Sequence, residues 1–158
     1  MLASGDCREA EPKVVGPPIR MDDPLVPGAL RQSVLVEGCG GRGLLNFMVL
    51  PAPEGGERVA PMFPGTTITE PTLQRDGLHQ AIVAAKVVAP DCNGFTVDGT
   101  RFDGPREPAS RGGGVAQPWN ETWLLGACGR RVAVPIEFAP DGRGTSIRVD
   151  TRAVRPLN

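Results

Sequence analysis

The residues with the clearest chemistry in this sequence are its four cysteines, Cys7, Cys39, Cys92 and Cys128. No two of them form the C-x-x-C pair of a thioredoxin-type redox site, and zinc sites also usually bring their ligands as close pairs. An even number of widely separated cysteines is instead typical of long-range disulfides, which form and persist in oxidising compartments. The cysteines therefore predict two disulfides in an exported protein.

Four cysteines allow three pairings, and the sequence alone does not decide between them. We expect Cys92–Cys128, which would join the end of a predicted helix to the C-terminal strands, and Cys7–Cys39, which would hold the N-terminal segment. In the chain-entropy description, closing a loop of about 35 residues stabilises a fold by about 3–4 kcal/mol.

The other residues that could carry catalysis do not form a recognisable site. The single histidine, His79, follows Asp76 by three residues, but no G-x-S-x-G motif supplies a nucleophile. Gly38, Gly40 and Gly43 match G-x-G-x-x-G, yet the segment after them is too short and too strand-like for the helix that a dinucleotide site requires. We therefore assign no catalytic residue, no metal ligand and no cofactor.

Carboxylates that are distant in sequence could still meet in the fold and act as an acid–base pair. The candidates are Asp98, Asp103, Glu121, Glu137, Asp141 and Asp150. Because most such residues are solvated groups of turns and surfaces, we assign no pair. A small exported hydrolase is kept as an alternative.

Trp119 and Trp123 are the only tryptophans, in a chain with five phenylalanines and no tyrosine. The interpretation we favour places both in the core. The alternative is that one of them, beside a glycine-rich loop, is an exposed contact for a partner protein, because aromatic side chains often dominate such interfaces.

Length and composition describe an ordered domain with long connections. The chain has 158 residues, of which 40% are hydrophobic, 21 are glycine and 17 are proline, and its formal net charge is −1. A charge so close to zero gives no electrostatic reason to expect nucleic acid as a partner. No apolar run approaches the ~20 residues of a transmembrane helix.

Residues 1–10 contain neither the basic nor the apolar region of a signal peptide. Either a leader has been removed, or the protein is cytosolic and its cysteines are free thiols. We expect the first, and therefore a periplasmic or secreted protein.

The hydrophobic pattern predicts an α+β fold. Residues 1–31, which are rich in proline, are expected to form an extended arm, residues 32–152 a single α+β domain, and residues 153–158 a C-terminal tail. In the first half of the domain, short alternating runs predict strands at 33–37 and 44–50.

One helix is predicted, at about residues 70–89, and Pro90 ends it. From Leu78 onward its apolar residues recur at three- and four-residue steps, with Gln74 on the polar side. Gly77 is unfavourable in a helix by about 1 kcal/mol relative to alanine, which we interpret as close packing against a sheet. We expect this helix to cover one face of an antiparallel sheet.

The C-terminal half carries the clearest β pattern. A hairpin with an Asp98-Gly99 turn is predicted over residues 95–102, and a loop over 104–118. Alternating residues from Glu121 to Val149 then predict a three-strand antiparallel meander.

These observations favour an exported, disulfide-stabilised, non-enzymatic accessory protein that binds another protein in the periplasm or at the cell surface. One alternative is the hydrolase described above. The other is a carrier for a small apolar ligand, held between helix and sheet beneath Leu78, Ile82 and Ala85.

Overall fold

The structure is a computed structural model that describes residues 10–21, 27–38, 41–105 and 117–157. Nine strands, one α-helix and one short 3₁₀-helix lie within these residues. The sequence led us to expect one domain over residues 32–152, whereas the chain forms two compact units, Met1–Pro71 and Thr72–Asn158. Each unit is described by itself.

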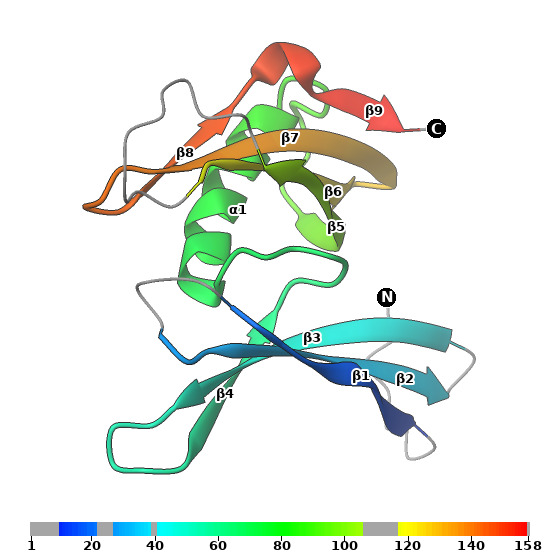
Figure 1. The fold of residues 1–158 in the computed structure, drawn as a ribbon. Helices are drawn as coiled ribbons and strands as arrows, with labels where there is room; N and C mark the ends of the chain where they lie inside the picture. Colours follow the sequence, from blue (N-terminus) through cyan, green and yellow to red (C-terminus); the bar gives the residue numbers. More distant parts are fainter. Residues whose placement is uncertain (1–9, 22–26, 39–40, 106–116, 158) are drawn as a thin grey trace. The chain divides into compact units, whose positions relative to one another are not determined.

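The first unit is built on sheet A, an antiparallel sheet in the order β1-β2-β3-β4 (Figure 1). Its strands are β1 (Glu11–Arg20), β2 (Leu30–Gly38), β3 (Gly41–Pro51) and β4 (Glu57–Met62). Residues 11–20, which were expected in the arm, pair along β2 with an irregularity between Val15 and Ile19. β1 tolerates its prolines because it is an edge strand, which needs backbone hydrogen bonds on one side only.

The glycine-rich motif joins β2 to β3. Gly38 pairs with Gly41, and Gly43 pairs with Val36, so the motif belongs to a β-hairpin and is followed by a strand. Residues 39 and 40, between the two strands, lie outside the described residues. The hairpin does not provide the helix N-terminus that a dinucleotide site needs.

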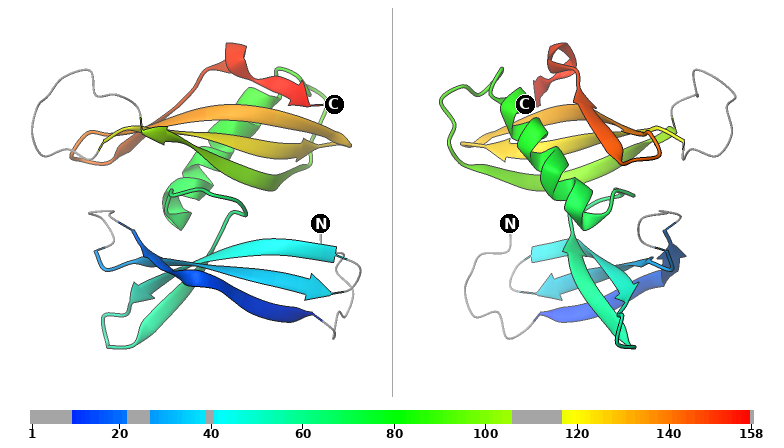
Figure 2. Two further views of the ribbon diagram at one scale, coloured as in Figure 1. Left: turned by 45° about the vertical axis from the view of Figure 1, so that its right-hand side comes forward. Right: turned by 90° about the vertical axis from the view of Figure 1, so that its left-hand side faces the viewer.

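The second unit packs α1 (Pro71–Ala85) against sheet B (Figure 2). Sheet B has the order β5 (Phe95–Pro105), β6 (Trp119–Ala127), β7 (Arg130–Pro140) and β8 (Thr145–Val149), and η1 (Thr151–Ala153) leads to β9 (Arg155–Leu157), which also pairs with β7. The α+β class is confirmed. The sheet is larger than the predicted three-strand meander, because β5 pairs with β6 and β9 pairs with β7, which gives five strands in all among the described residues.

The hairpin predicted over residues 95–102 is wrong. These residues belong to the single strand β5, and Asp98-Gly99 marks an irregularity in its pairing with β6. Glycine within a strand accommodates a bulge as readily as a turn. Because β6 offers a partner on both sides of the irregularity, the strand continues.

The core of the second unit combines large side chains from the sheet with small ones from the helix. Trp123 and Phe138 of sheet B are both 0% exposed. The buried residues of α1 are Gln74, Gly77, Ala81, Ala84 and Ala85. The predicted orientation of the helix is therefore wrong in part, because Gln74, expected on the polar side, is buried. The other buried positions of α1 are glycine and alanine, which fit against the large indole and phenyl rings.

The close packing inferred from Gly77 is confirmed. A Cβ atom built on Gly77 would lie 2.9 Å from Cη2 and 3.4 Å from Cζ3 of Trp123, and 3.6 Å from Cε1 of Phe138. Real Cβ atoms do not approach another atom as closely as 2.9 Å, and a fully buried indole has little room to move.

We predict that Gly77→Ala lowers the free energy of unfolding by about 1–3 kcal/mol, because overpacking outweighs the better helix propensity of alanine. Chemical denaturation followed by tryptophan fluorescence measures this change. Gly94→Ala is the control, since a Cβ at Gly94 meets nothing within 4 Å. A Gly77→Ala protein as stable as the parent would contradict the packing described here.

Candidate functional site

The structure joins Cys92 and Cys128 in a disulfide, with their Cα atoms 5.7 Å apart and a sequence separation of 36. The bond ties the segment after α1 to the turn between β6 and β7, as predicted. Cys7 and Cys39 lie outside the described residues, so their pairing stays a prediction. A disulfide is compatible with export to an oxidising compartment.

Cys128 has a backbone conformation that normally favours glycine or asparagine. Ala127 pairs with Arg130, so β6 and β7 are joined by Cys128 and Gly129 alone, with φ of 49° and 81°. Positive φ at both central residues is the requirement of a type I′ turn, in which Asn-Gly is preferred. Among the described residues, Cys128 is the one non-glycine residue with positive φ. The disulfide explains why a cysteine occupies this position.

The two tryptophans lie in different environments. Trp123 is 0% exposed, and its indole Nε1 donates a hydrogen bond to Oε2 of Glu121 at 2.7 Å. Trp119 is half-buried and stacks on Phe138, with ring centroids 5.2 Å apart. Contact with a partner through the exposed part of Trp119 stays a prediction.

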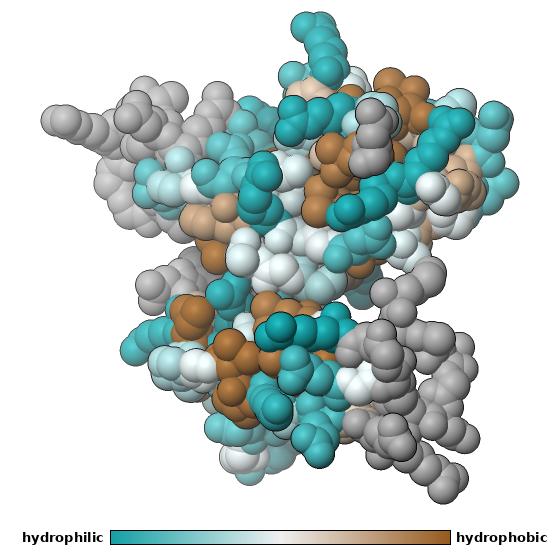
Figure 3. All heavy atoms as spheres, turned by 90° about the vertical axis from the view of Figure 1, so that its right-hand side faces the viewer, coloured by the Kyte–Doolittle hydropathy of each residue, from teal (hydrophilic) through white to brown (hydrophobic). Residues whose placement is uncertain are grey.

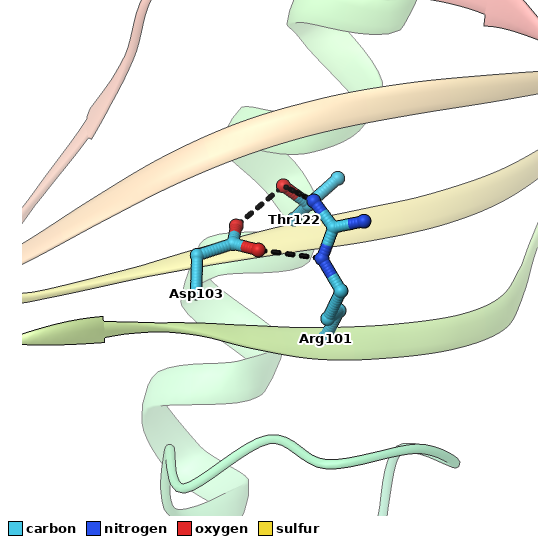
Figure 4. Close-up of polar contacts among 3 residues, drawn as sticks. All are labelled: Arg101, Asp103 and Thr122. Atoms are coloured by element: carbon cyan, nitrogen blue, oxygen red, sulfur yellow. Dashed lines mark hydrogen bonds and ion pairs between the residues drawn. The ribbon is translucent and has the colours of Figure 1, made fainter.

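Asp103 belongs to a polar cluster with Arg101 and Thr122 on sheet B (Figure 4). Nε of Arg101 donates to one carboxylate oxygen of Asp103 at 2.5 Å, and Oγ1 of Thr122 donates to the other at 2.5 Å. An Nη2 atom of the same arginine donates to Oγ1 of Thr122 at 3.3 Å. Both carboxylate oxygens of Asp103 therefore have protein partners.

The other candidate carboxylates also have structural contacts. Asp98 forms an ion pair with Arg131 at 3.7 Å, and Glu137 one with Arg148 at 3.8 Å. Asp141 accepts two backbone hydrogen bonds in the β7–β8 turn, and Asp150 caps η1. Together with the contact of Glu121 to an indole, these interactions give each candidate acid a role in stabilising strands or turns.

Two hollows of the second unit do not gather acidic groups. One of about 500 Å³ is lined by Gly129, Arg130, Arg131, Pro156 and Leu157. The other, of about 190 Å³, is lined by Ala89, Pro90, Asp91, Cys92, Ala127, Cys128 and Arg130. Neither hollow is lined by the helix residues beneath which a carrier would hold its ligand.

The parts of the chain that the structure describes contain neither a candidate metal site nor a candidate membrane-spanning helix. There, His79 is exposed on α1, and no three His, Cys, Asp or Glu side chains form a group that could hold a metal ion. Within those ranges the structure also has no helix with the length and apolar character that crossing a bilayer takes.

The surface that stands out is one face of sheet A. Residues paired across antiparallel strands lie on the same face, and their neighbours in sequence lie on the other. Val34 of β2 pairs with both Val14 of β1 and Leu45 of β3, so these three side chains lie on one face of the sheet. Every second residue of each strand from these positions shares that face. This face, called the apolar face from here on, carries Pro12, Val14, Arg20, Leu30, Gln32, Val34, Val36, Gly43, Leu45, Phe47, Val49, Pro51, Glu57, Val59 and Pro61.

No residue of the apolar face is buried. Val14 is 68% exposed, Val59 62% and Leu45 37%. In the described part of the chain, nine large hydrophobic side chains are exposed. Three of them, Val14, Leu45 and Val59, belong to the apolar face, and Val15, Ile19 and Leu44 belong to the opposite face of sheet A. Figure 3 shows hydrophobic side chains, in brown, at the surface of this unit.

The opposite face of sheet A is more polar and is partly covered. Asn46, 1% exposed, accepts a hydrogen bond from Ser33 and donates to the carbonyls of Phe63 and Gly65. Lys13, Glu37 and Arg42 form ion pairs at its far end. A half-exposed antiparallel sheet usually buries its apolar face and leaves its polar face in water. Sheet A follows this arrangement only in part. Met48 and Met62 are buried on its covered face, while the face with the larger share of apolar residues is in solvent.

Comparison of the chain with protein families, with curated proteins and with solved structures found no match. Function is therefore inferred from these surfaces and contacts.

We predict that the disulfide and the turn contribute separately to stability. A Cys92→Ala/Cys128→Ala protein should lose about 3–4 kcal/mol of unfolding free energy, because its denatured chain is no longer cross-linked. In the Cys92→Ala background, Asn or Gly at position 128 should be more stable than Ala by about 1 kcal/mol, because both residues adopt positive φ more easily. Urea unfolding of the three variants measures the difference. Equal free energies of unfolding for the proteins with Ala, Asn and Gly at position 128 would contradict the prediction that positive φ at this position is unfavourable for alanine.

Proposed function

We propose that this chain is an exported, disulfide-stabilised, non-enzymatic interaction protein that binds another protein, in the periplasm or at the cell surface, through the apolar face of sheet A. The observation that carries this proposal is the exposure of that face. Contiguous apolar surface on a folded domain is typical of a protein-interaction site.

The energetics favour a bound state. Removing apolar surface from water stabilises a complex by about 25 cal/mol per Å², so a face on the order of 500 Å² contributes about 12 kcal/mol before association costs. Association costs several kcal/mol or more in lost translational, rotational and side-chain freedom. The remaining favourable free energy is the affinity of the complex. In the absence of a partner, Val14 and Val59 keep 68% and 62% of their surface in water, which is unfavourable for apolar side chains.

The remaining chemistry supports a role without catalysis. The candidate carboxylates are engaged in ion pairs, turns and an indole contact, and the two hollows contain one acid between them, Asp91. A hydrolase would need two carboxylates in one concave site. The Cys92–Cys128 disulfide supports the exported location.

We predict that charge placed on the apolar face weakens partner binding. Proteins retained from an extract of the producing cells by the immobilised chain are identified by mass spectrometry, and the affinity of the purified partner is then measured. Val59→Asp should raise the dissociation constant at least about 10-fold, because a carboxylate must be desolvated at the interface.

The control for this experiment is Val87→Asp, because Val87 has the same side chain and the same exposed fraction, 62%, as Val59 but belongs to the other unit. Circular dichroism verifies that both variants are folded. Equal retention and equal affinity for the parent, Val59→Asp and Val87→Asp proteins would refute the assignment of this face.

A further inference from the structure

We infer that the partner of the apolar face is the same face of a second copy of this chain, in a two-fold sandwich whose axis runs parallel to the strands. The inference rests on the proposed function, since it names the partner of the same surface. It is drawn from the area of the face, its composition and the positions of its two charges.

The area is sufficient for a dimer at the lower limit of stable interfaces. Four strands about 4.8 Å apart and nine residues of β2 at about 3.3 Å each give a face of roughly 19 by 30 Å. Two copies would then bury on the order of 1,000–1,200 Å², against about 1,000 Å² for the smallest specific interfaces. We therefore expect a dissociation constant in the micromolar range.

The composition of the face is self-complementary. A two-fold interface places each residue of the patch against the same patch of the second copy, so a charge at its centre would meet a like charge. The centre of the apolar face is formed by Val34, Leu45 and Phe47, and Gln32 is its one polar residue away from the edges. Two twisted sheets stack in this way at about −30°, with their side chains interdigitated.

The two charged residues of the face lie on opposite edge strands. Arg20, on β1, is in register with Leu30, which pairs with Val49 and through it with Val59. Glu57, on β4, lies two residues before Val59 and pairs with Pro51. Residues two apart on a strand are separated by about 7 Å.

These positions select the direction of the axis. An axis parallel to the strands stacks β1 of one copy on β4 of the other, which brings Arg20 over Val59 of the second copy and within reach of its Glu57. The two-fold axis repeats this pair of Arg20 and Glu57 at the opposite edge of the sandwich. An axis perpendicular to the strands would stack β1 on β1 and set Arg20 against the Pro12 end, where the apolar face carries no acid. Charge complementarity therefore favours the axis parallel to the strands.

Sedimentation equilibrium of the full chain, over concentrations that bracket the micromolar range, tests the dimer. The parent and Val87→Asp proteins should dimerise alike. Val34→Asp should raise the dissociation constant at least about 100-fold, because two unpaired carboxylates become buried near the axis. Circular dichroism shows whether Val34→Asp is folded, and Val59→Asp, at a more exposed position, provides the same test if it is not.

A charge exchange tests the axis. Arg20→Glu should weaken dimerisation about 3- to 10-fold, because it sets two acids together at each edge, and the Arg20→Glu/Glu57→Arg protein should return to within about twofold of the parent. A double variant as weak as the single variant would exclude the axis parallel to the strands.

The outcomes separate this inference from the proposed function. A parent that is monomeric throughout, or a dimer that Val34→Asp and Val59→Asp leave intact, would overturn the sandwich. The parent protein could instead be monomeric and capture a partner that is not a second copy of this chain. If Val59→Asp then fails to retain that partner while Val87→Asp retains it, the proposed function stands and the second copy is excluded. If neither dimerisation nor capture responds to these variants, both proposals fail.

Discussion

The strand register of sheet A is the constraint on which the account depends. Side chains alternate between the two faces of a strand, so a slip of one residue between β2 and β3 would place Val34 and Leu45 on different faces of the sheet. The observed register places Val34 and Leu45 on one side and Ser33 and Asn46 on the other, where they bond to each other and Asn46 bonds to the segment after β4. The hydrogen bonds of Asn46 to the carbonyls of Phe63 and Gly65 hold this segment against the face that carries Ser33 and Asn46. The apolar face is left for contacts that the described chain does not itself supply.

The two units differ in how many large apolar side chains they bury. In the second unit, Trp123 and Phe138 are fully buried, and the helix presents mainly glycine and alanine among its buried residues. A disulfide fixes the turn at one end of the sheet. In the first unit, the buried cluster is small, with Met21, Ala29, Met48 and Met62 and partly buried Leu50 beside it. A sheet with so few buried apolar residues gains little from burial, which makes additional burial against a partner favourable. The second unit has a larger core, whereas the first has only this small cluster on the covered side of its apolar face.

Much of the local structure could be predicted because it depends on local pattern or covalent chemistry: β2, β3, the strands of the C-terminal meander, the helix, the Cys92–Cys128 disulfide and the close approach at Gly77. Features that depend on partners distant in sequence could not. Asp98-Gly99 has the composition of a turn and is a bulge, because β6 pairs with the residues on both sides of it. The apolar face had no sequence signal either. Its strands contain apolar runs, as in Val34-Leu35-Val36, from which periodicity alone cannot tell which side is covered.

The most direct test of the central claim is hydroxyl-radical footprinting of the native chain at low and high protein concentration. Val59 and Val87 have the same side chain and the same exposed fraction of 62%, so their intrinsic oxidation rates should agree when both are in solvent. The account predicts that Val59 and the apolar residues of β2 and β3 become protected as concentration rises, while Val87 is oxidised at a constant rate. Oxidation of Val59 that stays equal to that of Val87 at every concentration would show that the apolar face does not pair with a second copy, and would contradict the account.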